Sequence, residues 1–339
     1  MDSRELAHYR KRMPIRIQSP ASPVRTVEAS EFSRSLSREV VWVDLVNASP
    51  EEILVVQVTL GIELPTREEM REIEATSRFY CEDGARFMTT PLLVSTDSDD
   101  PIFTEIGFVL FRGHLITLRD SEPQSFRQTS VWLSRRPSVS RDQVFVTLLE
   151  TIVDRQADFL ERISKETEEL SQRIFTRHHK VKESENNLRE AIYRLGRSGN
   201  LIARERDCIV ALSRLVQYAG HEDFDDEGPA RETPLFPRLK PLLRDLQSLS
   251  EFAGFLSSKM NFMLDATLGL INIEQNAIVK IFTVAAVIFL PPTLVASIYG
   301  MNFEWMPELK WHFGYPFSLG MMLVSVLLPF WFCRRKGWL

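Results

Sequence analysis

Cysteine is scarce in this sequence, with only three residues in a chain of 339. Cys81, Cys208 and Cys333 lie far apart and lack the paired spacing of a disulfide framework or a zinc site. This usage is typical of a protein in a reducing, cytosolic compartment. Residues 1–18 are polar and basic without an apolar core, so we expect no signal peptide.

The sequence also lacks the blocks of basic residues that nucleic-acid binding requires. The formal net charge is −5, and no run of Lys and Arg is present to neutralise phosphates, so we expect no nucleic-acid partner. No Walker loop, nucleophile elbow or HExxH motif occurs. The sequence therefore gives no reason to expect an enzyme.

What the chain does contain is two long uncharged runs close to its C-terminus, at 281–298 and 313–333. About 20 helical residues at about 1.5 Å each match a bilayer core of roughly 30 Å. The residues before them are highly charged. We therefore predict a large soluble body with two transmembrane helices at its C-terminal end.

Charges flanking the two runs predict their orientation. Lys280 precedes the first run and Arg334, Arg335 and Lys336 follow the second, whereas the loop between them is slightly acidic. Because positive residues favour the cytoplasmic side, both termini are expected in the cytoplasm and the short loop outside.

The N-terminal part has the pattern of an α/β domain. Residues 40–45 read as a strand, and residues 87–94, 105–111 and 115–118 read as further strands. Ser49, followed by Pro50 and Glu52, predicts a helix start with a capping box, and Thr66 with Glu69 repeats the spacing.

From Asp142 the apolar period becomes helical, and a second helix is expected at about 183–218, so the two form an antiparallel hairpin. The acidic loop that follows, 222–227, is interpreted as solvated, with divalent-ion binding as the alternative. The His178–His179 pair is interpreted as a solvated surface pair.

After Pro237 and Pro241 the chain reads as one helix to Gly300. Its roughly 60 residues would extend about 90 Å, from the cytosol through the membrane.

These patterns give the following division of the chain: a flexible N-terminal segment (1–30), an α/β cytosolic domain (31–140), a cytosolic helical hairpin with an acidic loop (141–239), a long helix continuing into the first span (240–300), an external loop (301–312), a second transmembrane helix (313–333) and a basic cytosolic tail (334–339).

Two helices cannot enclose a hole, so a pore in this chain requires several copies around an axis. The first span carries small, weakly polar or apolar residues at steps of three and four, which we predict to line such a pore: Asn276, Val279, Phe282 (or Thr283), Ala286, Leu290, Thr293 and Ser297. Close helix packing is the alternative for Thr293 and Ser297. Pro291–Pro292 is either a simple kink or a source of free carbonyls facing a lumen.

The first span ends in Gly300-Met301-Asn302. Taken alone, this is a common helix C-cap, because glycine lets the backbone turn. Repeated around an axis, however, the Asn side chains would form a ring of neutral oxygens. Such a ring suits Mg²⁺, which prefers oxygen and loses its hydration water reluctantly, so it could be held through its waters.

The wider context of this motif resembles the CorA family of Mg²⁺ transport proteins, within the two-transmembrane Gly-Met-Asn metal ion transporter superfamily. The resemblance rests on the segments 273–276, 289–296, 299–309, 314–316 and 334–339. It is close over 240–339 and looser over 40–230, where Trp42-Val43-Asp44-Leu45 and the order of elements fit.

The resemblance implies a homopentameric, funnel-shaped channel with an α/β N-terminal cytosolic domain, long helices and two C-terminal transmembrane helices, the first lining the pore. It makes Gly300, Met301 and Asn302 the selectivity filter, and Glu304 and Glu308 an acidic loop that concentrates cations at the mouth. Asp265 is a candidate cytosolic pore carboxylate. The family's cytosolic Mg²⁺ sensors are not placed on this sequence.

The expected function is therefore influx of hydrated Mg²⁺ across the bacterial inner (plasma) membrane, gated by cytosolic Mg²⁺, with Co²⁺ and Ni²⁺ as further ions. The expected partners are other copies of the chain, membrane lipid and divalent cations, and no organic cofactor is expected. A zinc or other divalent-cation transporter of the same superfamily is one alternative, and a membrane-anchored scaffold or sensor is another.

Overall fold

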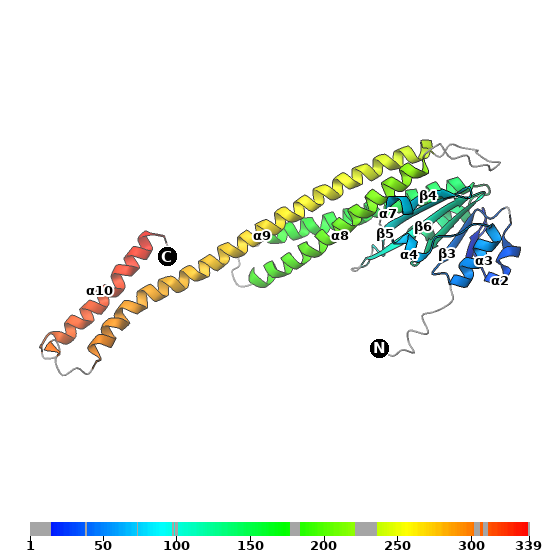
Figure 1. The fold of residues 1–339 in the computed structure, drawn as a ribbon. Coiled ribbons are helices and arrows are strands. Elements are labelled where there is room, and N and C mark those ends of the chain that lie inside the picture. Colours follow the sequence, from blue (N-terminus) through cyan, green and yellow to red (C-terminus); the bar gives the residue numbers. More distant parts are fainter. Residues whose placement is uncertain are drawn as a thin grey trace. The chain divides into compact units, whose positions relative to one another are not determined.

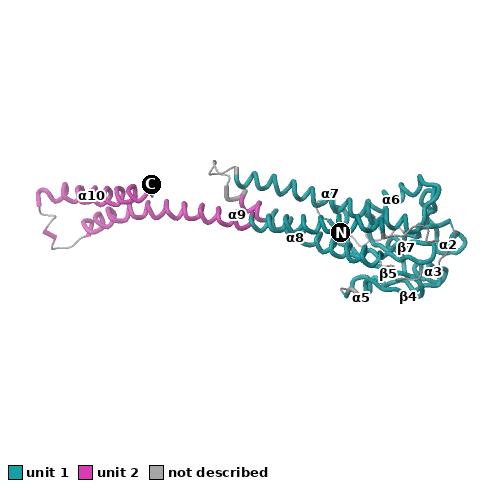
Figure 2. The backbone as a smooth tube through the Cα atoms, turned by 90° about the horizontal axis from the view of Figure 1, so that it is seen from above, with its two compact units in different colours: residues 1–177, 193–262 teal, residues 178–192, 263–339 magenta. Residues whose placement is uncertain are grey.

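The structure is a computed structural model, and it describes residues 15–37, 39–72, 74–96, 98, 101–176, 184–220, 236–301, 306–307 and 311–337. The chain divides into two compact units (Figure 2). Unit 1 comprises Met1–Arg177 and Tyr193–Phe262, and unit 2 comprises His178–Ile192 and Met263–Leu339.

Unit 1 is built on a seven-stranded sheet with the order β2-β1-β3-β7-β6-β5-β4 (Figure 1). The strands are β1 (Ile15–Gln18), β2 (Arg25–Val27), β3 (Trp42–Val46), β4 (Phe79–Glu82), β5 (Ala85–Val94), β6 (Ile102–Phe111) and β7 (His114–Arg119). Among the described strands, only the pair β3 and β7 is parallel, with Asp44 opposite Thr117, and the other pairs are antiparallel.

The first two strands correct the expectation of a flexible segment over residues 1–30. Residues 15–18 and 25–27 lie at one side of the sheet, where Ile15, Ile17 and Val27 are buried. The alternation of Ile15 and Ile17 is only one strand-period long and is flanked by prolines and serines. So short a pattern does not stand out in the sequence, and pairing with β3 makes it a strand.

The helices are α2 (Ala29–Ser35), α3 (Pro50–Leu60), α4 (Arg67–Met70), α5 (Ala75–Arg78), α6 (Gln124–Ser134), α7 (Arg141–Thr176), α8 (Ser184–Ala219), α9 (Phe236–Tyr299) and α10 (Gly314–Arg335). Both predicted capping boxes are confirmed. Ser49 and Thr66 each accept from the backbone N–H three residues on, and Glu52 and Glu69 accept from the N-cap backbone.

Helices cover both faces of the sheet. On one face Val43, Leu45 and Ile116 join a core with residues of α2, α3 and α4, including Phe32, Val56 and Met70. On the opposite face Phe108 contacts Phe126 of α6 and Phe145 of α7, with ring centroids 6.5 and 5.9 Å apart. Strand residues alternate between these faces, which explains why the central strands are buried almost throughout.

A buried polar network lies on the α6 face of the central strands. Arg119 donates from Nε and Nη2 to the two carboxylate oxygens of Asp44, at 2.9 and 2.6 Å. Thr117 donates to the same carboxylate at 2.7 Å, and Trp42 Nε1 donates to Thr117 at 3.0 Å. Within the Trp42-Val43-Asp44-Leu45 segment, Trp42 and Asp44 thus lie on a face where polar groups are hydrogen-bonded to one another. Val43 and Leu45 lie on the opposite, apolar face.

Contacts with the sheet confirm that α7 and α8 run antiparallel. Arg141 at the start of α7 donates to the Arg112 carbonyl, and Gln156, further along, donates to the Leu93 carbonyl. Residues 85 and 111 pair at one end of the β5–β6 ladder and residues 94 and 102 at the other. The end of α8 returns to the first end, where Arg86 donates to the Ala219 carbonyl at 2.7 Å.

A buried carboxyl group joins these two helices. Glu205 of α8 is fully buried, and the amide oxygen of Gln156 of α7 lies 3.0 and 2.9 Å from its two carboxyl oxygens. Burial raises the pKa of Glu205 well above its usual value, which favours the protonated form. A protonated Glu205 would donate to the Gln156 oxygen while the Gln156 nitrogen donates to Leu93, so that both side chains are satisfied.

Helix α9 begins four residues before the start expected at 240, at Phe236. Pro237 lies in its first turn, where the missing N–H has no intrahelical acceptor to lose. Within unit 1, α9 runs parallel to α7, because Arg238 contacts Glu150 at 3.3 Å and Lys259 contacts Glu168 at 2.7 Å.

Candidate functional site

Two helices in the described part of the chain are long and apolar enough to cross a membrane. The most apolar windows in α9 and α10 have mean hydropathies of 2.2 and 1.8, and few of their residues are buried within the chain. Their positions agree with the two uncharged runs in the sequence. The predicted second span at 313–333 corresponds to α10, Gly314–Arg335.

Within unit 2, α10 lies beside the last part of α9 in both views (Figures 1 and 2). Its buried residues are Gly314, Ser318 and Cys333, which are all small. On α9, Val284 is buried, and Ile288 and Val295 are half-buried. Small residues allow close approach of two backbones, which is how membrane helices usually associate.

The predicted pore face lies on the other side of α9. At about 100° per residue, most of its members cluster roughly opposite Val284, and Asn276 lies about 80° from it. Every one of them is exposed in the single chain: Asn276, Val279, Phe282, Ala286, Leu290, Thr293 and Ser297. Phe282 and Leu290 are 71% and 66% exposed, large values for apolar side chains. This strip therefore remains uncovered after α10 has packed.

The hydroxyl of Thr293 hydrogen-bonds to its own helix. Its Oγ1 donates to the carbonyls of Phe289 and Leu290, at 3.0 and 2.9 Å. Thr283 does the same with the Val279 carbonyl at 2.8 Å. Because the proton is used within the helix, the exposed side of each oxygen carries only lone pairs. These hydroxyls are therefore suited to accept from water or to face a cation.

The helix continues through Pro291–Pro292 and ends at Tyr299. Each proline lacks an N–H, so two carbonyls of the preceding turn lose their usual partner. Both proline side chains are half-buried, whereas Thr293 beside them is exposed. The hydrogen bonds from the Thr293 hydroxyl to the Phe289 and Leu290 carbonyls add contacts within this weakened turn.

Gly300 follows the end of the helix, and its N–H donates to the Ala296 carbonyl at 2.9 Å. Its φ is not in the left-handed region, so conformational freedom is not the reason for glycine here. A Cβ at this position would lie 3.1 Å from the Ala296 carbonyl oxygen. A side chain here would therefore require this contact to lengthen by a few tenths of an ångström. Met301 is 46% exposed, and Asn302 lies outside the described residues.

Asp265, the candidate pore carboxylate, is exposed on α9 and lies on nearly the same side of the helix as Asn276. Among the residues that the structure describes, no group of three His, Cys, Asp or Glu side chains could hold a metal ion. Glu304 and Glu308 lie outside the described residues, as do His178–His179 and the acidic loop 222–227.

One contact at the opposite end of the two apolar helices from Gly300 could not be predicted from the sequence. Lys280 Nζ donates to the Gly337 carbonyl at 2.8 Å, which joins the start of the first apolar run to the tail after the second. Arg335 also lies over the Trp331 ring, 5.4 Å from its centroid. The sequence predicts these basic residues at one interface, but a main-chain acceptor cannot be read from residue types.

Known proteins match this chain over nearly its whole length. The family model described as "CorA-like Mg2+ transporter protein" matches residues 37–335. The magnesium transport protein CorA of Escherichia coli (strain K12) is 36% identical over 301 residues, covering 88% of this chain and 92% of that protein. CorA of Salmonella typhimurium (strain LT2) is 36% identical over 311 residues, covering 91% and 95%.

The fold comparison agrees. The complete structure of the CorA magnesium transporter from Methanocaldococcus jannaschii matches with a TM-score of 0.74 at 17% identity, covering 96% of this chain and 99% of that one. At this identity the match shows the fold, including the two C-terminal apolar helices. With the family model and the sequence relatives, these findings show that the chain belongs to the family of CorA-like Mg²⁺ transporter proteins.

Proposed function

We propose that this protein is a channel that passes hydrated Mg²⁺ into the cytosol. Membership of a Mg²⁺ transporter family supports Mg²⁺ as the transported ion. The observation that carries the pathway is the exposed strip on α9, which lies opposite the α10 contact and leads to Gly300. A helix that served only as an anchor would have no reason to keep Asn276 and Thr293 on this strip.

The channel is proposed to be a homopentamer. Two helices cannot surround an axis, so the pathway needs several copies, each contributing its α9 strip. The apolar members of the strip, Val279, Phe282 and Leu290, would form a hydrophobic constriction, and the polar ones would provide steps for a hydrated ion. In this arrangement α10 lies outside α9 and faces lipid, where its exposed Leu and Phe side chains are favourable.

The chemistry along this pathway suits a strongly hydrated cation. Lone pairs of Thr293 and the side-chain carbonyls of Asn276 accept hydrogen bonds from the waters around Mg²⁺ rather than replacing them. Gly300, Met301 and Asn302 are proposed as the selectivity filter, with Glu304 and Glu308 raising the local cation concentration at the mouth. Neutral oxygens bind weakly enough for the ion to leave.

Transport needs no chemical energy source, and we assign no enzymatic activity. An inside-negative potential of about 100 mV provides roughly 4.6 kcal/mol for a divalent ion. We propose that cytosolic Mg²⁺ holds the channel closed by bridging carboxylates of neighbouring subunits. Asp265 is the candidate on the pathway itself, because copies around an axis would bring their carboxylates together.

The proposed location is the bacterial inner membrane, with both termini in the cytosol. Lys280 and the residues Arg334–Lys336 mark the cytosolic side, as the positive-inside tendency predicts. The α/β domain (31–140) and the hairpin (141–239) then lie in the cytosol, and residues 301–312 form the external loop.

Mg²⁺ flux into proteoliposomes, with the internal Mg²⁺ concentration varied, tests this proposal. Uptake that falls as internal Mg²⁺ rises supports both transport and regulation, and uptake independent of internal Mg²⁺ contradicts the regulation alone. Competition by Co²⁺, Ni²⁺ and Zn²⁺ distinguishes a Mg²⁺ channel from a zinc transporter. No flux from an intact reconstituted oligomer would favour a membrane-anchored scaffold.

A further inference from the structure

Four basic residues, called the basic group below, gather at one end of the two apolar helices: Lys280 on α9 and Arg334–Lys336 at the end of α10. In this unit α10 lies beside the last part of α9 (Figures 1 and 2). Lys280 Nζ donates to the carbonyl of Gly337, the residue directly after Lys336, at 2.8 Å. Orientation of the spans requires only positive charge on the cytosolic side, and it does not explain these positions.

The positive charge of the basic group is not balanced by nearby acidic residues. No carboxylate in the part of the chain that the structure describes forms an ion pair with any of its members. The preceding acidic residue on α9 is Glu274, about 9 Å before Lys280 along the helix axis. Trp338 and Leu339 lie outside the described residues and have uncharged side chains, and a terminal carboxylate after them would still leave three of the four positive charges unbalanced. Because like charges repel, the group favours an anion from outside the chain.

Two of these cations lie over aromatic rings one turn earlier on α10. The guanidinium carbon of Arg335 is 5.4 Å from the centroid of the Trp331 ring, and Lys336 Nζ is 5.5 Å from that of Phe332. Trp331 and Phe332 are 58% and 52% exposed, so both rings remain accessible. A ring attracts a cation without neutralising its charge. Neither basic side chain donates a hydrogen bond to a described residue, so both can donate to an anion.

The pair of Trp331 and Arg335 lies on the side of α10 that faces away from α9. Cys333 is the buried residue of this turn. At about 100° per residue, Trp331 and Arg335 each lie about 160° around the helix from Cys333. If α10 crosses a membrane, this outer side borders lipid, with the rings next to the acyl chains and the cations at the level of the headgroups. Aromatic and basic side chains commonly occupy these depths.

We propose that Arg335 and Lys336 bind the headgroup of an anionic phospholipid, with Trp331 and Phe332 in contact with its acyl chains. The guanidinium and ammonium groups would donate hydrogen bonds to the phosphate oxygens. A zwitterionic lipid fits less well, because its own ammonium would add a fifth positive charge beside the basic group. Free phosphate would make no use of the exposed rings. The site goes beyond the proposed channel, since it requires α10 to cross a membrane but no ion transport.

Native mass spectrometry of the full-length protein in detergent tests the proposal. The probes are phosphatidylglycerol, which is anionic, and phosphatidylcholine with the same acyl chains. We expect phosphatidylglycerol to bind more tightly. Arg335→Gln combined with Lys336→Gln should weaken its binding by roughly tenfold or more, because each basic residue near a membrane surface contributes about fivefold. Lys240→Gln is the control, because Lys240 is also exposed but belongs to unit 1.

Trp331→Leu tests whether the ring positions the cation. This variant keeps every charge and an apolar side chain, and we expect phosphatidylglycerol to bind about two- to fivefold more weakly because Arg335 loses its ring. The proposal is overturned if the two lipids bind equally, if the double variant binds as Lys240→Gln does, or if Trp331→Leu binds as the parent does. Displacement of phosphatidylglycerol by an equal concentration of inorganic phosphate would also overturn it. Because binding is measured without ion flux, the outcome is independent of the proposed channel function.

Discussion

Arg119 holds Asp44 through two parallel hydrogen bonds, at 2.9 and 2.6 Å, across the only parallel pair of strands in the described sheet. Both side chains are almost fully withdrawn from water, at 1% and 10% exposure. Arg119 also lies over the Phe126 ring, 4.5 Å from its centroid. This pair therefore fixes the centre of the sheet to α6.

Removing one partner of this ion pair should be strongly destabilising. Asp44→Ala leaves the buried guanidinium with only the more distant carboxylate of Glu122, at 3.5 Å, and we expect a loss of about 3–5 kcal/mol in the free energy of unfolding. Asp120→Ala is the control, since its ion pair with Arg67 is exposed, and should cost about 1 kcal/mol or less. Urea unfolding of the detergent-solubilised protein, followed by circular dichroism, measures both. Equal losses would show that the buried pair has no special role.

Asn302→Ala should abolish selective Mg²⁺ uptake while leaving assembly intact. The substitution removes the side-chain oxygen and amide from the proposed filter without adding volume, so we expect uptake to fall by roughly tenfold or more. Uptake in proteoliposomes and the elution volume in size-exclusion chromatography measure the two effects. Normal Mg²⁺ uptake by this variant would count heavily against the filter assignment.

Gly300→Ala should impair transport for a steric reason. The new Cβ would lie 3.1 Å from the Ala296 carbonyl oxygen, so the last turn of α9 must shift. Gly320→Ala is the control, because a Cβ there meets nothing outside its own helix within 4 Å. Because alanine has a higher helix propensity than glycine, that change should increase the stability of the α10 helix by up to about 1 kcal/mol. Comparable uptake by the two variants would argue that the turn tolerates displacement.

Thiol accessibility distinguishes the proposed pore face from the helix contact. In a Cys81→Ser background, where the remaining native cysteines are buried, Thr293→Cys should react with a charged thiol reagent and Val284→Cys should not. The reason is that a charged reagent requires water, and α10 covers only Val284. Reaction rates measured on reconstituted protein test this. An unreactive Thr293→Cys would place that side chain in lipid or in a dry contact.

Stability should depend on pH through Glu205. Its pKa is raised in the folded protein by burial, so the folded state keeps a proton that the unfolded chain has lost. The resulting stability is present below the usual pKa of about 4.5 and is lost as the pH rises toward the folded pKa. Glu205→Gln removes this titration and should gain stability relative to the parent as the pH rises from about 5 toward the folded pKa.

Melting temperatures across this pH range measure the effect, with Glu161→Gln as the control, because Glu161 is exposed on α7. If the difference in melting temperature between Glu205→Gln and the parent stays constant with pH, Glu205 has the same protonation state in the folded and the unfolded protein.

Much of the architecture could be predicted from local chemistry. Capping boxes at Ser49 and Thr66 and the apolar strands after them depend on short-range patterns, and the structure has them at those positions. Strands β1 and β2 could not be predicted, because each is short. Each gains its stability from pairing with a neighbouring strand, and this pairing forms only when the chain folds.

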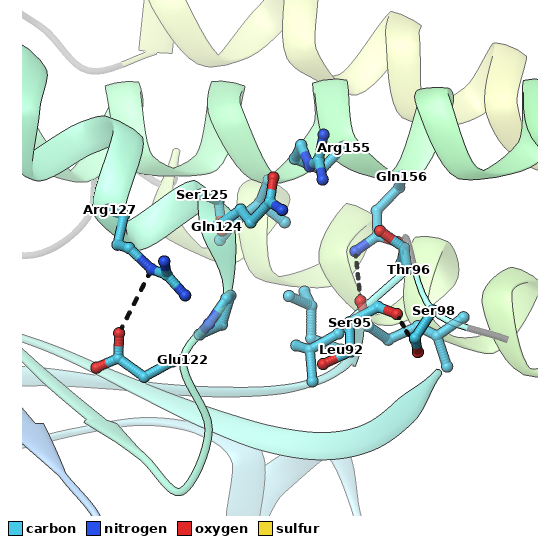
Figure 3. A pocket seen from close by; sticks show the side chains of 14 residues that line it. Leu92, Ser95, Thr96, Ser98, Glu122, Gln124, Ser125, Arg127, Arg155 and Gln156 are labelled. Carbon is cyan, nitrogen blue, oxygen red and sulfur yellow. Dashed lines mark hydrogen bonds and ion pairs between the residues drawn. The ribbon is translucent and has the colours of Figure 1, made fainter. Parts of the chain in front are cut away.

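The candidate sites differ in the same way. The strip on α9 follows a helical period, so the sequence could list its members, and the structure adds that α10 covers the opposite side. A cavity of about 350 Å³ in unit 1, beside the start of α6 (Figure 3), could not be listed, because lining residues such as Thr96, Arg127 and Arg155 come from separate elements and follow no common period. Only the fold of the sheet and helices brings them together.

The buried residues of α10 have a consequence for motion within the membrane. Gly314, Ser318 and Cys333 are small, so they do not lock into gaps between side chains of a neighbouring helix. Interlocking side chains must change rotamer before two helices can slide, whereas a shallow surface needs few such changes. In the proposed channel, we therefore expect α9 to rotate or shift along α10 at low energetic cost, with α10 guiding the movement rather than preventing it.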